Sequence, residues 1–225
     1  MKAIKDEILF NFNIRRSKQG QLTIYENILK ELSDFFPSIT PNFLLVNENI
    51  VSINGFSDKR IVEVIQQQAK KEELPVKIKD TQKGFSILFS TDTTGFTSSI
   101  HTSLLTNHTE KGFVNKFKEF INITKPLYAV CLLYSINIRI HIKHFRWEPR
   151  TPASGSLAWL QYFGAEEFLR QGGEDIFDNP YIQAEKIGDG VLIQVGDSPY
   201  DAYTPEGEEL LVKATKAMPP VVEDE

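Results

Sequence analysis

The alternation of apolar and polar positions predicts short strands and helices along the first half of the chain. Apolar residues recur at every second position over residues 8–14, which is typical of a half-buried strand. They recur at helical spacing from Gln21 to Phe36, and Pro37 follows where that helix is expected to end. A second helix is expected from Ser57 or Asp58 to about Glu73.

The same pattern predicts two strand pairs, followed by a loop. Residues 42–46 (NFLLV) and 49–53 (NIVSI) form a short hairpin or one bent strand, and residues 76–80 (VKIKD) and 84–92 (GFSILFSTD) form two further strands. Residues 93–112 are polar and break the pattern, so we expect a loop or a junction between two halves there. A helix over residues 113–121 follows it.

The second half begins with an apolar run at residues 126–135 (PLYAVCLLYS), whose length suits either a buried strand or a buried helix. Isoleucines at alternate positions then predict a strand over residues 136–147, with one core face and one basic face. We expect a turn at residues 150–155, a strand over 157–164 and a short helix over 165–171.

A hairpin and a helix complete the predicted elements. Residues 181–188 and 190–197 form two strands that meet at Gly188-Asp189-Gly190, a sequence that favours a turn. Thr204 with Pro205 is a strong helix start. Carboxylates near a helix N-terminus offset the helix dipole, and three of them follow Pro205: Glu206, Glu208 and Glu209.

These elements predict an α+β fold with mostly antiparallel sheets and packed helices. The composition change at Pro126 indicates an N-terminal α+β half, residues 1–125, and a C-terminal acidic α+β half, residues 126–225. The alternative is one compact domain. At 225 residues with 41% hydrophobic residues, the chain is long enough to bury a substantial core either way.

Composition narrows the environment in which the protein is expected to work. The sequence holds no run of about 18 apolar residues, and acids interrupt its first ten residues, so neither a membrane span nor a signal peptide is expected. We therefore expect a cytoplasmic protein with no membrane partner. Cys131, the one cysteine, lies in an apolar run, so we expect a thiol packed in the core.

Charge is distributed unevenly along the chain. Residues 1–150 carry 21 Lys plus Arg against 15 Asp plus Glu, a net of +6, whereas residues 151–225 carry 4 against 15, a net of −11. Such an acidic segment repels nucleic acid but attracts a basic protein; the alternative is an acidic face that only keeps the protein soluble. Several aromatic residues lie among these acids, some in the core and others available as interface anchors: Trp159, Tyr162, Phe163, Phe177, Tyr181, Tyr200 and Tyr203.

The chemistry of a catalytic or metal site is not recognisable in the sequence. His141 and His144 would point to opposite faces of a strand, and Asp189, Asp197 and Asp201 are too sparse for a calcium loop. A phosphate-binding loop and a nucleophile elbow are also missing. The carboxylate pairs at residues 166–167 and 174–175 do not converge on one substrate, so we expect no catalytic residue, no metal and no cofactor.

Three stretches nevertheless indicate a family. FRWEPRTP at residues 145–152, LAWLQYF at 157–163 and EKIGDGVLIQVGDSPYDAYTPEGEELLVKA at 185–214 occur in the order seen in immunity proteins encoded beside type VI secretion toxins. Residues 143–220 resemble immunity-protein family fifty-two and the related type VI immunity family first catalogued as a domain of unknown function. The shared features are the Arg-Trp turn, the Trp-containing strand, the GDG hairpin and the Thr-Pro-Glu helix.

The resemblance implies a non-enzymatic antitoxin that binds a cognate toxin and blocks its active site. For this family the toxin would be a nuclease of the restriction-endonuclease fold, whose basic cleft a carboxylate surface can occlude. The expected toxin-binding residues lie on the last hairpin and the loop after it, namely Asp189, Asp197, Tyr200, Asp201 and Tyr203. The expected rim of the interface consists of Glu166, Glu167, Glu174 and Asp175.

Two other classes of function stay open at this point. A structural or assembly protein that self-associates would carry a large apolar patch and form a concentration-dependent oligomer. A hydrolase using Glu174 or Asp197 would require a pocket where these acids meet a base or a metal. The sequence identifies neither the toxin nor the oligomeric state.

Overall fold

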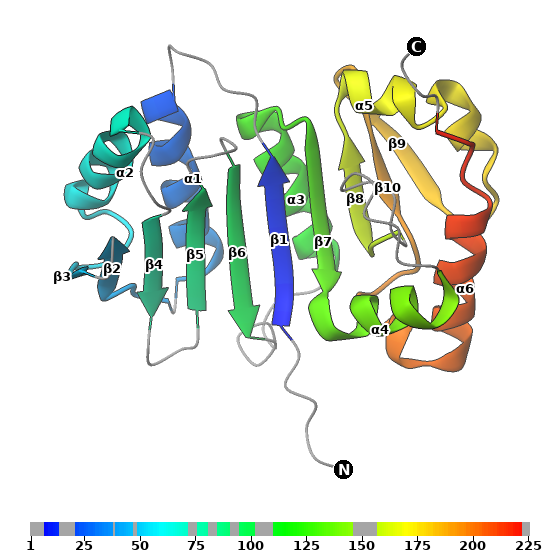
Figure 1. Cartoon of the computed structure of the whole chain (residues 1–225), viewed down its shortest axis with the longest axis horizontal. Coiled ribbons are helices and arrows are strands. Elements are labelled where there is room, and N and C mark those ends of the chain that lie inside the picture. The colour runs from blue at the N-terminus through cyan, green and yellow to red at the C-terminus, as the bar shows by residue number, and fades with distance from the viewer. Residues whose placement is uncertain are drawn as a thin grey trace.

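A ten-stranded sheet forms the centre of the fold (Figure 1). The computed structural model describes residues 7–13, 21–37, 39–46, 49–71, 76–80, 85–90, 95–101, 110–145 and 157–221. Within these ranges the strand order is β3-β2-β4-β5-β6-β1-β7-β8-β10-β9, and every neighbouring pair is antiparallel. The expected α+β class with antiparallel sheets and packed helices is confirmed.

The sheet and its helices have the following bounds. The strands are β1 (Glu7–Asn13), β2 (Phe43–Val46), β3 (Asn49–Ser52), β4 (Val76–Asp80), β5 (Phe85–Ser90), β6 (Gly95–His101), β7 (Tyr128–Leu133), β8 (Leu160–Phe163), β9 (Gln183–Ile187) and β10 (Gly190–Gln194). The α-helices are α1 (Gln21–Phe35), α2 (Lys59–Lys71), α3 (Glu110–Thr124), α4 (Tyr134–His144), α5 (Ala165–Arg170) and α6 (Pro205–Lys216). Two 3-10 helices, η2 (Gly173–Asp178) and η3 (Asp201–Tyr203), lie in the C-terminal part.

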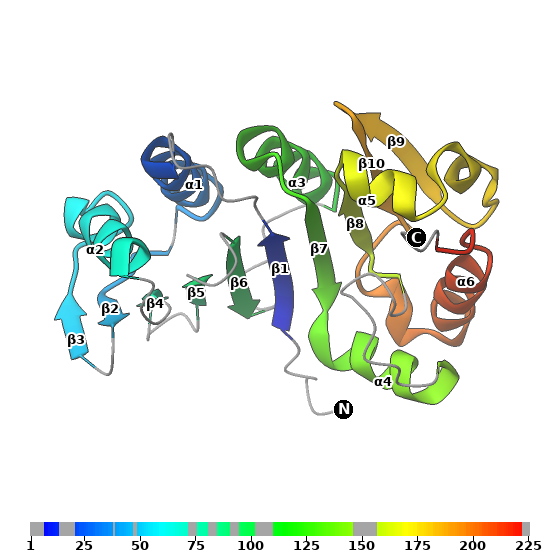
Figure 2. The same ribbon diagram turned by 45° about the horizontal axis from the view of Figure 1, so that its top comes forward.

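The helices divide between the two faces of the sheet. Helices α1, α2 and α3 lie on one face, and α4, α5 and α6 lie on the other, gathered over β7 to β10 (Figures 1 and 2). Burial follows this arrangement: all four residues of β8 are buried, whereas in β4 buried Val76 and Ile78 alternate with half-buried Lys77 and Lys79. The fold therefore has three layers at its C-terminal end and two layers over β4.

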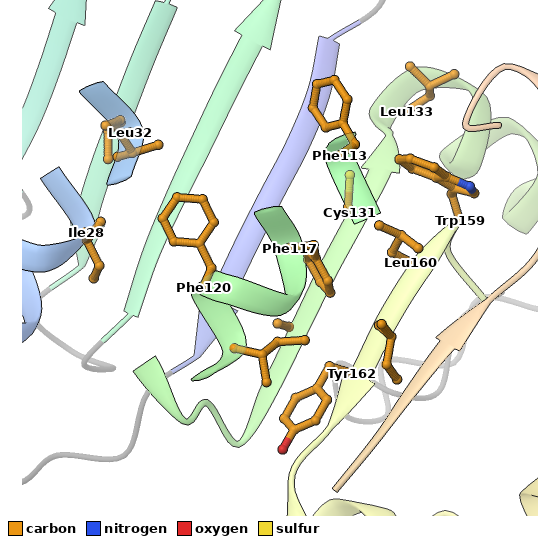
Figure 3. Close-up of a cluster of buried hydrophobic side chains, with 14 of the residues drawn as sticks. Ile28, Leu32, Phe113, Phe117, Phe120, Cys131, Leu133, Trp159, Leu160 and Tyr162 are labelled. Carbon is orange, nitrogen blue, oxygen red and sulfur yellow. The ribbon is translucent and has the colours of Figure 1, made fainter. Parts of the chain in front are cut away.

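The core forms where α3 packs on the sheet. Phe117 of α3 is fully buried and lies among Cys131 of β7 and Leu160 and Tyr162 of β8 (Figure 3). Cys131 is a buried free thiol, as the sequence predicts, and this burial raises the pKa of the thiol well above its usual value. Burial of apolar side chains in such a core is the main stabilising contribution to the fold.

Strand β1 lies in the middle of the sheet although it comes first in the chain. It pairs with β6 on one side, where Glu7 faces His101, and with β7 on the other, where Ile8 faces Leu133. Its pairing with β7 continues the sheet from the residues 1–125 half into the residues 126–225 half.

Two predicted elements are wrong. Residues 136–144 form most of helix α4 instead of a strand, since buried Ile136 and Ile140 lie one helical turn apart while Ile142 is 67% exposed. Residues 95–101, expected to be a loop or a junction, form strand β6, whose backbone pairs with β5 and β1 on its two sides. The rest of that polar stretch up to residue 109 and the expected turn at residues 150–155 lie outside the described residues.

Most other predicted elements are confirmed. Residues 43–52 form the β2–β3 hairpin, and the apolar run at 128–133 is strand β7. The β9–β10 hairpin also forms, but its positive φ of 59° falls on Gly188, while Gly190 begins β10 against the Phe163 carbonyl and the Tyr162 hydroxyl. Thr204 caps α6 by accepting a hydrogen bond from the Gly207 N–H at 3.1 Å.

Candidate interaction surface

The nine predicted contact residues lie in two groups at opposite ends of β10. Asp189 occupies the turn before β10. The end of β8 pairs with the start of β10, and α5 follows directly after β8, so residues 166 and 167 also lie near the start of β10. Residues 174 and 175 belong to the same end, because Glu174 forms an ion pair with Lys186 of β9. The remaining four residues, 197, 200, 201 and 203, follow the other end of β10. The structure therefore does not gather the predicted set into one site.

The group after β10 is built around the Asp201 carboxylate. This carboxylate accepts hydrogen bonds from the backbone N–H groups of Asp197 at 2.9 Å and Ser198 at 3.0 Å. It also lies close to Gly196, whose φ of 75° suits glycine. Asp201 thus holds the loop in shape, and within this group the exposed carboxylate is that of Asp197.

The two tyrosines of this loop are stacked on each other. The ring centroids of Tyr200 and Tyr203 lie 6.5 Å apart with an angle of 14° between the ring planes. Tyr200 is 39% exposed, whereas Tyr203 is half-buried against the core. A partner can therefore reach Tyr200 more easily than Tyr203.

At the other end of β10, two of the predicted acids are already engaged. Glu167 accepts hydrogen bonds from Arg170 at 3.0 Å and from Gln171 at 2.7 Å. Burial is the main cause that raises the pKa of Tyr128, and the negative charge of Glu167 raises it further. Glu174 pairs with Lys186 at 2.5 Å. Glu166, Asp175 and Asp189, the other predicted residues of this group, are exposed.

A group of four ionisable side chains was not predicted as a unit. The carboxylate of Glu208, in the first turns of α6, lies 3.1 Å from Arg139 Nη2, 2.5 Å from Lys143 Nζ and 2.8 Å from His144 Nε2, all on α4. The hydrogen bonds from Lys143 and then from His144 are the main causes that lower the pKa of Glu208 to about 2. The group joins α4 to α6 at the surface.

This group could not be read from the sequence, because its partners are 64 to 69 residues apart and α4 was expected to be a strand. The helical geometry also changes the histidine prediction. His141 is buried and stacks on Phe145 with centroids 6.0 Å apart, while His144 binds Glu208. Among the residues that the structure describes, no three His, Cys, Asp or Glu side chains are grouped as a metal site would require.

A groove between α1 and α2 is a second surface feature that the sequence did not predict. Its volume is about 500 Å³, its floor consists of buried Leu29, Phe56 and Val62, and its rim carries charges of both signs, among them Lys30 and Glu63.

None of the helices that the structure describes is both long enough and apolar enough to cross a membrane.

Comparison with known proteins gives a likeness of fold. No family model and no curated protein matches the sequence. The structure is similar to that of the Pseudomonas aeruginosa T6SS protein PA0821, with a TM-score of 0.59 and 15% sequence identity over 95% of this chain and 73% of that chain. At this identity the similarity concerns the fold alone. The chain thus has the fold of a Pseudomonas aeruginosa type VI secretion protein.

Proposed function

We propose that the protein is an immunity protein that binds a cognate bacterial toxin and blocks it without catalysing a reaction. The observation that carries the proposal is the acidic surface of the C-terminal third, where residues 151–225 have a net charge of −11. Exposed carboxylates lie at both ends of β10, at Asp189 and Asp197. A surface of this kind favours association with a basic protein and speeds the encounter.

Two similarities support a bacterial toxin as the partner. Residues 143–220 resemble type VI immunity proteins in the order of their motifs, and the fold is similar to that of a type VI secretion protein. We infer from the resemblance that the toxin is a nuclease. Such an enzyme needs a basic cleft to hold phosphates, and a rigid acidic surface can occupy that cleft in place of DNA.

The experiment that tests the proposal is co-expression with the product of the adjacent upstream gene. We expect a complex that survives purification, dissociates as salt is raised, and abolishes DNA degradation by that protein. Charge reversal at Asp189 and Asp197 should weaken the complex, whereas reversal at Glu26 and Glu63, which are also exposed acids but lie on α1 and α2, should not. DNA degradation that continues at saturating amounts of this protein would contradict the proposal.

A structural feature favours a second candidate, an assembly protein that self-associates. Within the described part of the chain, β3 and β9 each pair with one strand only, and an open sheet edge can pair with another copy. Sedimentation velocity over a hundredfold range of concentration separates the two candidates. A stable oligomer that does not bind the upstream gene product would favour assembly over toxin binding.

A further inference from the structure

Large exposed apolar side chains concentrate at one corner of the molecule. Seven large hydrophobic residues are exposed among the described residues, and four of them lie on α5, on η2 and in the segments that follow η2 and α6. Their exposed fractions are 68% for Leu169, 38% for Phe177, 39% for Tyr181 and 45% for Val221. We name these four residues, together with Asp175, Asp178 and Asp189, the α5–η2 corner. Such concentration differs from the scattered exposure of single apolar residues that is normal for a protein surface.

Contacts between these segments show that the corner is one place in the fold. Phe177 meets the ring of Phe168, the neighbour of Leu169 in the chain, edge to face at 6.4 Å. Pro219 lies directly against Gly172, which brings the segment after α6, with Val221, to the start of η2.

The corner is also held in shape from beneath. Buried Ile176 anchors η2, and the side chain of buried Asn179 donates a hydrogen bond to the Ala214 carbonyl of α6 at 2.8 Å. The same side chain accepts a hydrogen bond from the Tyr181 N–H at 3.0 Å. Because the backbone is fixed in this way, little ordering is required when a partner binds to the exposed side chains.

The charge of the corner indicates the chemistry of the partner. Exposed Asp175, Asp178 and Asp189 have no ion-pair partner within the part of the chain that the structure describes. The cations near these residues are engaged: Arg170 pairs with Glu167, and Lys186 pairs with Glu174 and lies 5.8 Å from the ring centroid of Phe177. Lys213, which interacts electrostatically with Tyr181, pairs with Glu209. The corner therefore offers exposed apolar side chains together with three exposed carboxylates that have no ion-pair partner among the described residues, which is complementary to a basic surface with an apolar hollow.

We propose that the α5–η2 corner is the docking surface for a basic partner protein, with Leu169 and Phe177 as its central anchors. The inference rests on the proposed function and specifies the surface that performs it. It moves the centre of the interface away from the loop at residues 197–203, where the Asp201 carboxylate is used to hold the loop itself. Anchors of this kind give most of the affinity of an interface, and the charged rim gives the rate and the specificity.

The test uses a pair of variants with matched exposure. Leu169 and Ile50 are both 68% exposed, but Ile50 lies on β3 at the opposite edge of the sheet. Calorimetric titration with the upstream gene product should show that Leu169→Asp weakens binding at least about tenfold, while Ile50→Asp changes it less than about twofold. Thermal unfolding checks that both variants are folded. Weakening by Ile50→Asp, or by Asp197→Lys alone, with unchanged binding of Leu169→Asp would overturn the proposal.

A second arm keeps the proposal testable if the upstream gene product does not bind. An amphipathic peptide of alternating lysine and leucine is titrated into the ¹⁵N-labelled protein, and amide shifts are mapped by NMR. Shifts concentrated at residues 166–189, and lost in Leu169→Asp, would support a basic partner other than the toxin, and the proposed function alone would fail. Shifts at the groove between α1 and α2, or none, would refute the docking surface. A dimer that Leu169→Asp dissociates would also refute it, since the occupant would then be a second copy.

Discussion

Replacing Glu208 by glutamine is expected to destabilise the contact between α4 and α6. The side chain of Glu208 is 13% exposed, and its carboxylate is approached by three basic side chains of α4, which lower its pKa from 4.5 to about 2. A shift of that size corresponds to about 3 kcal/mol of stability. Arg139 and Lys143 are 53% and 60% exposed, so water screens much of this interaction. We therefore expect Glu208→Gln to cost about 1–2 kcal/mol at pH 7.

The pH dependence distinguishes a charge effect from a loss of packing. Because the folded-state pKa lies below the unfolded value, the stabilisation is fully present above pH 4.5 and is lost as the pH falls from 4.5 through about 2. Wild type and Glu208→Gln should therefore differ by about 3–6 °C in Tm at pH 7, and this difference should shrink below pH 4.

The neighbouring residue supplies the control. Glu209 pairs with Lys213 one turn along α6 and its side chain is 65% exposed, so Glu209→Gln should leave Tm nearly unchanged at all pH values. Urea unfolding at pH 7 and at pH 2.5, each at low and high salt, measures the loss of stability in the two variants. The reasoning would be refuted by equal losses in the two variants, or by a loss in Glu208→Gln that persists unchanged at pH 2.5.

Three further substitutions test other parts of the fold. Asp58→Ala removes the side chain that accepts from the N–H groups of Asn54 and Arg60 at the start of α2, so chemical unfolding should show a loss of about 1 kcal/mol, which Asp58→Asn largely avoids. Gly190→Ala should lower Tm more than Gly188→Ala, because an added Cβ at Gly190 meets backbone and ring atoms whereas at Gly188 it meets only the cost of positive φ. Phe117→Ala should cost about 3–5 kcal/mol in urea unfolding, since the ring is fully buried under α3.

Sequence patterns predicted the fold well where one period dominates. The helix at residues 21–35 and the strand at residues 76–80 each have a single clear pattern, and both form as expected. Helix α4 does not, because isoleucines at every second position also contain pairs four apart, and packing of Ile136 and Ile140 decides between the two periods. Strand β6 was missed for another reason: its pairing with β5 and β1 is long-range and leaves little apolar signal in the residues themselves.

The candidate site was predictable only in its charge. Counting acids locates the negative third of the chain, but it does not separate a carboxylate that holds a loop, as in Asp201, from one that is exposed, as in Asp197. Nor does it show which aromatic residues reach solvent. Of those lying among the acids, Trp159 is buried and Phe177 is exposed, a difference that depends on which elements pack over β8 and β10.

The central position of β1 has a consequence for biosynthesis. Strand β1 is synthesised before both strands that it pairs with, and its partner β7 ends at Leu133, more than a hundred residues later. At about 5–20 residues per second, roughly 6–25 s pass before both neighbours of β1 exist. During this interval an apolar strand with two unpaired edges is exposed to other nascent chains and to chaperones. The order of synthesis therefore exposes β1 to aggregation during this interval, even though neighbouring strands pair with it on both sides in the finished molecule.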